Sequence, residues 1–240
     1  MLRPGAFTIT DRAMDIFDLP KGSKILEVGC GEGDTTERLE KHFGFDVSAI
    51  DMSMEMVRIA KERGLAANIL LGDGEFLDEF SSHTFDGVVM ECVLSLINLP
   101  DEALHESYCV LKKGGKLFIS DLYLKKPEPG LLRSLDIEAQ RLAKKPHDES
   151  SCSDDCADDH KKRLVNFRSG EVLLLEPLRK TLEDMGFQII VEEDYSSELG
   201  SYLAESILNG QTNLSKEPLP KDTGYFLLIA EKARKDNTNE

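Results

Sequence analysis

Three glycines alternate with other residues directly after a short apolar segment, and an acidic residue follows at a fixed distance. Gly29, Gly31 and Gly33 come after residues 25–28, which are apolar except for Glu27, and Asp51 lies 20 residues beyond the middle glycine. Glycine allows a sharp turn and a close approach of the backbone to a ligand, at the start of a helix whose N–H groups are free. An acid at the end of the next strand can accept hydrogen bonds from ribose hydroxyls. The pattern predicts a nucleotide-type cofactor site.

The glycine spacing separates two classes of cofactor. A dinucleotide fingerprint, G-x-G-x-x-G/A, needs Gly or Ala at position 34. This chain has Asp34 there, and its third glycine, Gly33, comes one residue early. A phosphate-binding Walker loop is excluded because no Gly-Lys-Ser/Thr follows. The spacing favours a ligand without a pyrophosphate.

Residues 25–33 read Ile-Leu-Glu-Val-Gly-Cys-Gly-Glu-Gly. This segment resembles the first motif of the class I S-adenosylmethionine-dependent methyltransferases, hydrophobic-Leu-Asp/Glu-hydrophobic-Gly-x-Gly-x-Gly. The resemblance covers nearly the whole chain apart from residues 125–168. It implies an α/β fold with a doubly wound, seven-stranded, mostly parallel sheet whose last strand is antiparallel. It also implies an enzyme of the small-molecule methyltransferase type, with S-adenosyl-L-methionine as cosubstrate.

Hydrophobic periodicity predicts alternating strands and helices, which is typical of a parallel sheet covered on both faces. Strands are expected at 25–28, 47–50, 68–71, 85–90, 116–120, 187–191 and 225–230, the fifth of them after a turn at Gly114 and Gly115. Helices are expected at 6–18, 35–42, 54–63, 100–111, 171–185 and 197–208.

The 240 residues fit one methyltransferase domain. Residues 1–22 are expected to form an N-terminal helix that can cover the site, with Arg3 or Thr8 touching the methionine carboxylate of the cofactor. Residues 125–168 lack a clean period and form a lid or variable insertion, with one amphipathic helix at 131–142. Residues 234–240 are a frayed tail.

The resemblance implies a set of cofactor-binding residues at the carboxyl ends of the strands. Asp51 would bind the ribose hydroxyls, Met52 would pack on the adenine, and Asp73 would accept from the adenine amine. Glu27 would hold the glycine loop or approach the cofactor's amino group. The full expected set is Glu27, Gly29, Cys30, Gly31, Gly33, Asp51, Met52, Asp73, Gly74, Glu75 and Glu91.

Three residues after the fourth and fifth strands are the catalytic candidates. Glu91 could serve as a general base or help bind the methionine ammonium, and it could equally cap the following helix. Asp121 and Tyr123 could orient the acceptor. Methyl transfer from a sulfonium needs chiefly in-line approach and exclusion of water, so no single acid identifies the acceptor.

A second group of residues that could do chemistry lies in the insertion. Cys152, Cys156 and His160 repeat at steps of four residues and would share one face of a helix. Two thiolates and an imidazole suit zinc, another soft ion or a metalloid acceptor, and the alternative is a solvated lid. No metal is assigned from the sequence.

Composition limits the class of partner. The net charge of −16 disfavours nucleic acid and anionic membranes. The apolar runs are shorter than a membrane span, and five scattered cysteines do not indicate a secreted disulfide framework. A cytoplasmic protein with a small-molecule acceptor is expected. The sequence leaves the oligomeric state open, with a homodimer as the state considered. Two alternatives stay open, a non-catalytic S-adenosylmethionine-binding module and a nicotinamide-dependent oxidoreductase.

Overall fold

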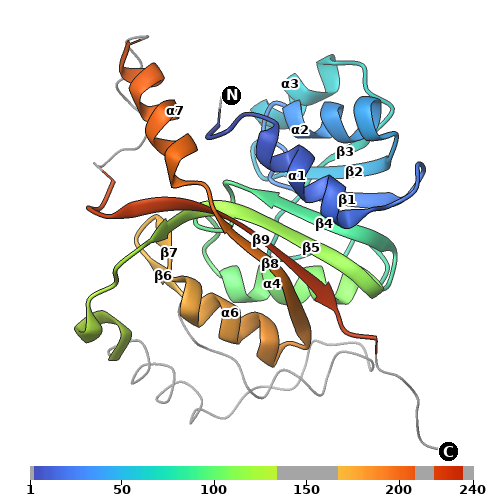
Figure 1. Ribbon diagram of the computed structural model, residues 1–240. Coiled ribbons are helices and arrows are strands. Elements are labelled where there is room, and N and C mark those ends of the chain that lie inside the picture. The colour runs from blue at the N-terminus through green and yellow to red at the C-terminus, as the bar shows by residue number, and fades with distance from the viewer. Residues whose placement is uncertain (1–2, 134–166, 209–218, 235–240) are drawn as a thin grey trace, which may run out of the picture.

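The computed structural model describes residues 3–133, 167–208 and 219–234, and they are built around one mixed sheet (Figure 1). The sheet has nine strands in the order β3-β2-β1-β4-β5-β7-β6, and β9 pairs with both β5 and β8. Strands β1 to β5 are parallel, whereas β9 runs antiparallel to β5 and β8. The doubly wound, mostly parallel fold with an antiparallel last strand is confirmed.

The strands are β1 (Lys24–Val28), β2 (Asp46–Asp51), β3 (Asn68–Leu71), β4 (Phe85–Glu91), β5 (Leu111–Leu124), β6 (Arg168–Ser169), β7 (Val172–Leu173), β8 (Phe187–Asp194) and β9 (Thr223–Lys232). The helices are α1 (Thr8–Phe17), α2 (Asp34–Glu37), α3 (Met54–Glu62), α4 (Pro100–Val110), α6 (Leu175–Asp184) and α7 (Ser196–Leu208), with a π-helix, η1 (Arg38–Phe43), after α2.

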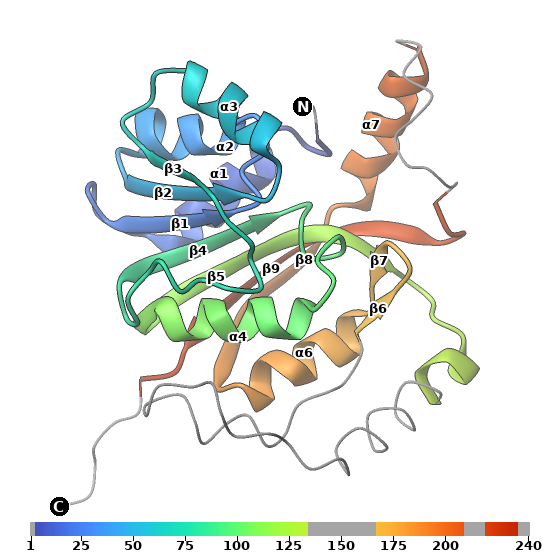
Figure 2. The same cartoon turned by 180° about the vertical axis from the view of Figure 1, so that it is seen from behind.

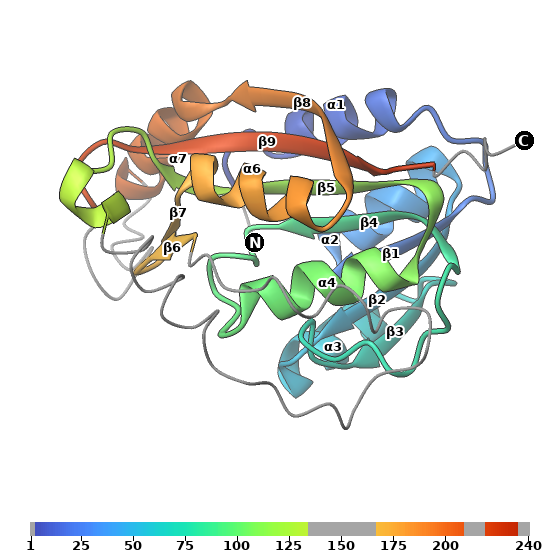
Figure 3. The same cartoon turned by 90° about the horizontal axis from the view of Figure 1, so that it is seen from below.

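Side chains of the central strands alternate between two cores because neighbouring residues of a strand point to opposite faces. Leu117 and Ile119 of β5 pack with α4 and α6, whereas Phe118 packs with α1. Figure 2 shows α4 and α6 side by side on one face, and Figure 3 shows α1 and α2 on the other. Both faces are therefore covered, which explains the long apolar runs of the strands.

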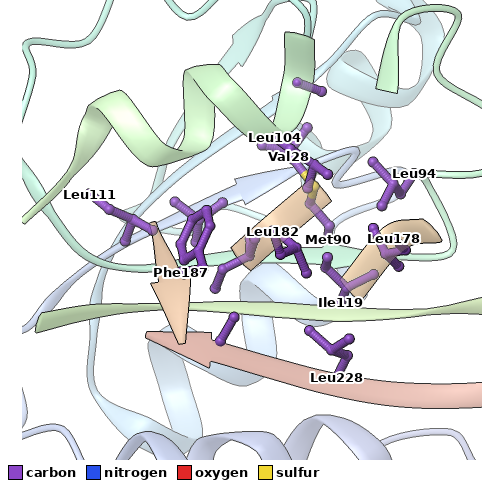
Figure 4. Packing of buried hydrophobic residues seen from close by; sticks show 14 of the residues in the cluster. Val28, Met90, Leu94, Leu104, Leu111, Ile119, Leu178, Leu182, Phe187 and Leu228 are labelled. Carbon is purple, nitrogen blue, oxygen red and sulfur yellow. The ribbon is translucent and has the colours of Figure 1, made fainter. Parts of the chain in front are cut away.

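The larger core lies under α4 and α6. Met90, Ile119 and Leu228 come from three adjacent strands and meet Leu178 and Leu182 of α6 (Figure 4). All five side chains are buried, and each such burial stabilises the fold by about 1.5–3 kcal/mol. This core supports the carboxyl ends of β1, β4 and β5 from below.

Several element boundaries differ from those expected. The expected helix at 171–185 begins only at Leu175, because residues 172–173 form β7. The helix at 35–42 is a short α-helix followed by a π-helix. Strand β5 begins at Leu111, and the glycine pair at 114–115 lies in an irregularity of its pairing with β4 rather than in a turn before the strand. Hydrophobic periodicity predicts which residues face the core, but it does not predict a short strand, a π-helix or a strand irregularity.

The two short strands β6 and β7 raise the number of strands from the seven expected to nine. They form a hairpin, and β7 pairs with β5 at Tyr123, beyond the last pairing of β4 with β5 at Ser120. Most of the expected insertion, including its helix beyond residue 133, lies outside the described residues. In the described part of the chain, every helix is too short or too polar to span a membrane.

Candidate active site

The glycine loop and Asp51 are joined directly. The Asp51 carboxylate accepts hydrogen bonds from the backbone N–H of Gly31 at 2.8 Å and from that of Ser53 at 2.9 Å. Strand pairing brings these residues together, because β1 and β2 are parallel neighbours and Cys30 N donates to Ile50 O. The loop and the acid therefore form one rigid unit, with carboxylate lone pairs left for a ligand.

The glycines of the loop have different surroundings. A Cβ atom at Gly29 would lie 2.5 Å from Cγ2 of Val93, so a larger residue is excluded there by packing. A Cβ atom at Gly31 would meet no atom within 4 Å, although its φ of 52° also favours glycine. The loop is thus packed on the side of Gly29 and open at Gly31, which fits a cradle that a ligand fills.

Two threonines at the start of α2 reach the acids that end two strands. The hydroxyl of Thr36 donates to Glu27 at 2.6 Å, and that of Thr35 donates to Glu91 at 2.7 Å. Glu27 is buried, and its burial raises its pKa to about 8 despite the hydrogen bond from Thr36. These bonds fix the first turn of α2, whose backbone N–H groups face the carboxyl edge of the sheet.

The N-terminal segment closes over Glu91. Arg3 lies 3.3 Å from the Glu91 carboxylate and donates to Thr10 at 2.9 Å, while the Thr10 hydroxyl donates to Glu91 at 2.9 Å. The Arg3 guanidinium also lies over the ring of Phe7. Glu91 thus binds α1 and α2 to the end of β4, in a network of Arg3, Thr10 and Thr35.

Asp121 holds the loop that follows β4. Its carboxylate accepts from Ser95 N at 2.9 Å, Ser95 Oγ at 2.8 Å and Leu122 N at 2.7 Å. Burial raises the pKa of Asp121 to about 6, against the opposing effect of these donors. Arg168 of the β6–β7 hairpin donates to the carbonyls of Ser95 and Ile97 and holds the same loop from the other side.

Tyr123 lies two residues beyond Asp121, on the same face of β5. Its ring packs edge-on against Phe226 at 5.8 Å, and burial raises the pKa of its hydroxyl. On the opposite face, the Cys92 thiol lies 2.8 Å from the hydroxyl of Tyr225. Burial raises the pKa of the Cys92 thiol to about 12. Cys92 is therefore a packed thiol at neutral pH.

Asp73 and Glu75 have local partners. Asp73 accepts from Glu75 N at 3.0 Å, and the Glu75 side chain accepts from Leu99 N at 3.0 Å, just before α4. A Cβ atom at Gly74 would lie 2.7 Å from Val28, so the segment after β3 packs closely on β1. The Glu75 side chain is used to hold the start of α4. A ligand at this position would therefore contact the backbone around Glu75.

Apolar side chains stand exposed beside Asp51 and Asp73. Met52 is 74% exposed, Leu71 is 53% exposed and Phe76 is 59% exposed. Leu71 pairs with Asp51 in the sheet, and Phe76 bridges to Asp73. Exposed apolar side chains gathered at one edge are typical of a surface that a flat apolar ligand covers.

Cys30 is buried next to the loop, with its Sγ 3.8 Å from the carbonyl oxygen of Gly31, and burial raises the pKa of its thiol. In the described parts of the chain no three His, Cys, Asp or Glu side chains are grouped to hold a metal ion. The trio of Cys152, Cys156 and His160 lies outside the described residues.

The sequence interpretation did not single out Thr10, Thr35, Thr36 and Ser95 as parts of the site. Each uses a hydroxyl to hold an acidic side chain of β1, β4 or β5. For Thr35 and Thr36, the sequence does offer a signal, since the two threonines are adjacent and come shortly after the glycine loop. Thr10 and Ser95 carry no local signal, since only the tertiary fold brings them to Glu91 and Asp121.

Comparison with known proteins gives a match to a methyltransferase domain over residues 26–119. A wheat (Triticum aestivum) phosphoethanolamine N-methyltransferase 1 is 27% identical over 91% of this chain and 38% of its own length. A ubiquinone biosynthesis O-methyltransferase of Xanthomonas axonopodis is 35% identical over 43% of this chain and 44% of its own length. The chain spans less than half the length of these relatives.

Solved structures show the same fold. Phosphoethanolamine N-methyltransferase 2 of Haemonchus contortus, in complex with S-adenosyl-L-methionine, has a TM-score of 0.68 at 18% identity and covers 96% of this chain and 54% of its own. The [4+2]-cyclase SpnF has a TM-score of 0.64 at 24% identity, covering 93% of this chain and 81% of its own. The domain match therefore shows a methyltransferase domain over residues 26–119, and the solved structures show that the chain has the fold of the class I S-adenosylmethionine-dependent methyltransferases.

Proposed function

We propose that this chain is an enzyme that binds S-adenosyl-L-methionine at the carboxyl edge of β1, β2 and β4 and transfers its methyl group to a small molecule. The observation that carries the proposal is the glycine loop, open at Gly31 and tied by its backbone N–H to Asp51. The family match and the cofactor named for the Haemonchus neighbour support it. The activity of the whole chain is part of this proposal.

The residues at this edge suit the parts of that cosubstrate. Asp51 would accept from the ribose hydroxyls, and Met52 with Phe76 would cover the adenine, whose amine Asp73 would bind. The backbone of residues 29–33 would run along the methionine part, under the start of α2. Glu91 would favour its ammonium and sulfonium charges, because a carboxylate attracts cations most strongly where water is excluded. Glu27, whose pKa burial raises to about 8, would instead hold the start of α2 through Thr36.

The bound cosubstrate supplies a methyl group already activated on a positive sulfur. The protein then has to exclude water and hold the acceptor in line with the sulfur–carbon bond. The N-terminal segment, held to Glu91 by Arg3 and Thr10, would provide part of that cover. Asp121 and Tyr123 share one face of β5, where they would orient the acceptor; Glu91 stays the third catalytic candidate.

We infer a small-molecule acceptor. The phosphoethanolamine and ubiquinone-biosynthesis relatives support this class, and the net charge of −16 disfavours a nucleic acid. Among the described residues, Cys30, Cys92 and Cys109 form no disulfide, which supports a reducing compartment such as the cytoplasm.

The second candidate function is a module that binds the cofactor but transfers no methyl group. The neighbour SpnF is described as a [4+2]-cyclase, which shows that this fold serves more than one activity. A third alternative, a nicotinamide-dependent oxidoreductase, is disfavoured by Asp34, which stands where the dinucleotide pattern has glycine or alanine.

The test of the proposed activity is transfer of a labelled methyl group. The protein is incubated with S-adenosyl-L-methionine carrying a deuterated methyl group and separate pools of small amines, phenols and thiols, and products are read by mass spectrometry. Labelled product that depends on Asp51 supports a methyltransferase, with Asp46→Asn, at the far end of the same strand, as the control. Cosubstrate binding without any labelled product supports the non-catalytic module.

A further inference from the structure

The glycine loop has a second attachment besides Asp51. Arg63, which follows α3, donates to the carbonyl oxygen of Glu32 at 2.5 Å and to the carboxylate of Glu37 at 2.6 Å, and it also pairs with Asp34. One side chain therefore contacts the loop backbone and the first turn of α2. Its three nitrogens, Nε, Nη1 and Nη2, each donate to a different residue, as the planar fork of a guanidinium allows.

Helix α3 consequently holds the loop from both of its ends. At its start, Asp51 accepts from Gly31 N and from Ser53 N, and Ser53 caps the helix. At its end, Arg63 binds Glu32 and Asp34, the residues on either side of Gly33. The loop between the two attachments has an open side at Gly31, so packing does not fix it there.

The packing beneath the loop depends on the same helix. A Cβ atom at Gly33 would lie 3.1 Å from Cβ of Ala60 and 3.4 Å from Cδ of Arg63. The aliphatic part of Arg63 therefore lies under Gly33 while its guanidinium reaches past it. Arg63 faces oxygen atoms of three residues, Glu32, Asp34 and Glu37, and Glu37 also pairs with Lys41. Without Arg63, the carboxylates of Asp34 and Glu37 at the start of α2 would lose the cation that they share.

This arrangement gives a reason for the residue that departs from the dinucleotide pattern. Position 34 carries a carboxylate at the first residue of α2, and its partner is Arg63. A small residue at this position could not make the ion pair. Asp34 therefore belongs to the attachment of the loop rather than to the ligand surface.

We propose that Arg63 is a positioning residue for the cosubstrate site: through Glu32, Asp34 and Glu37 it sets the shape of the glycine loop for the bound ligand. The inference rests on the proposed function, because the ligand is the proposed cosubstrate. Loss of Arg63 releases one end of the loop while Asp51 keeps the other, so the site stays present but is held less tightly.

The test compares Arg63→Gln with Arg58→Gln. Arg58 lies in α3 and pairs with Glu55 and Glu62 of that helix; among the described residues it contacts none of the glycine loop. S-adenosylhomocysteine binding is measured by calorimetry at a temperature where circular dichroism shows every variant folded. We expect Kd to rise about tenfold for Arg63→Gln, the size of one lost charge-assisted hydrogen bond, and to stay unchanged for Arg58→Gln.

Two further readouts separate positioning from general stability. Amide hydrogen exchange should accelerate at residues 31–37 in Arg63→Gln, with the strands β4 and β5 unchanged. In a double-mutant cycle, Asp34→Asn should add little to Arg63→Gln, because both remove the same ion pair. Unchanged Kd and unchanged exchange at residues 31–37 in Arg63→Gln would overturn the inference. Absence of S-adenosylhomocysteine binding to the unaltered protein would instead overturn the proposed function.

Discussion

The hydroxyl of Thr36 donates a 2.6 Å hydrogen bond to Glu27 inside the protein, so the first turn of α2 rests on a carboxyl group shielded from water. Burial raises the pKa of Glu27 to about 8. The folded protein therefore keeps a proton on Glu27 at pH values where the unfolded chain has released it. This relationship makes stability depend on pH through one identifiable group.

Replacing Glu27 by glutamine should remove that dependence. In the unaltered protein, the free energy of unfolding falls as the pH rises from about 5 to about 8, by up to about 1.4 kcal/mol per pH unit from this group. Above pH 8 both states are deprotonated and the contribution is constant. Urea unfolding at several pH values should show the stability of Glu27→Gln relative to the unaltered protein growing over that window; parallel profiles would contradict the prediction.

The two glycines of the loop should respond differently to alanine. Gly29→Ala should lower the free energy of unfolding by about 3 kcal/mol, because the added methyl group meets Val93 and the backbone is left-handed. Gly31→Ala should cost only about 1 kcal/mol, from the backbone alone. It should nevertheless weaken S-adenosylhomocysteine binding at least about tenfold, since its methyl group enters the open cradle.

Thermal unfolding and calorimetry on the two variants check this contrast. Val93→Ala should recover part of the stability of Gly29→Ala, because it makes room for the added methyl group. The assignment of Gly31 to the ligand surface is wrong if Gly31→Ala binds S-adenosylhomocysteine as tightly as the unaltered protein does.

Removing Arg3 should loosen the N-terminal segment. In Arg3→Gln the buried Glu91 carboxylate loses its cationic partner, and the free energy of unfolding should fall by about 2 kcal/mol. Amide exchange of residues 3–10 should accelerate. The matched control is Arg12→Gln, which removes a more exposed pair with Glu193 and should change stability less than Arg3→Gln does, because water screens an exposed pair. Equal effects of the two variants would count against the role of Arg3.

The loop after β4 should depend on Ser95. Ser95→Ala removes one donor from the Asp121 carboxylate and raises the pKa of that group further above its usual range. A buried acid with a raised pKa destabilises the fold once it is ionised, so the loss should be larger at pH 8 than at pH 5, reaching about 2 kcal/mol. Ser81→Ala, at an exposed site, is the control. A loss independent of pH would contradict this reading of Asp121.

Local sequence patterns were sufficient for the fold. The alternation of apolar runs located the main strands and most helices, because burial on both faces of a parallel sheet requires those runs. The hairpin of β6 and β7 could not be found this way, since each strand has two residues and no period. The start of α6 was misplaced for the same reason.

The cofactor half of the site was more accessible to sequence than the rest. Gly31 and Asp51 are joined as their 20-residue spacing suggests. The sequence predicts Glu91 and Asp121 at strand ends; Glu91 ends β4, whereas β5 continues past Asp121 to Leu124. Their partners Thr10, Arg3 and Ser95 are set by tertiary packing and have no fixed spacing. Arg63 likewise reaches the loop across 29 residues from Asp34. The ligand roles of all these residues stay predictions.

The most direct test of the central claim is calorimetric titration of the unaltered protein with S-adenosylhomocysteine and, separately, with NAD. The account predicts saturable binding of S-adenosylhomocysteine with one site per chain, lost in Asp51→Asn and kept in Asp46→Asn, together with no measurable binding of NAD. Binding of NAD without binding of S-adenosylhomocysteine would contradict it.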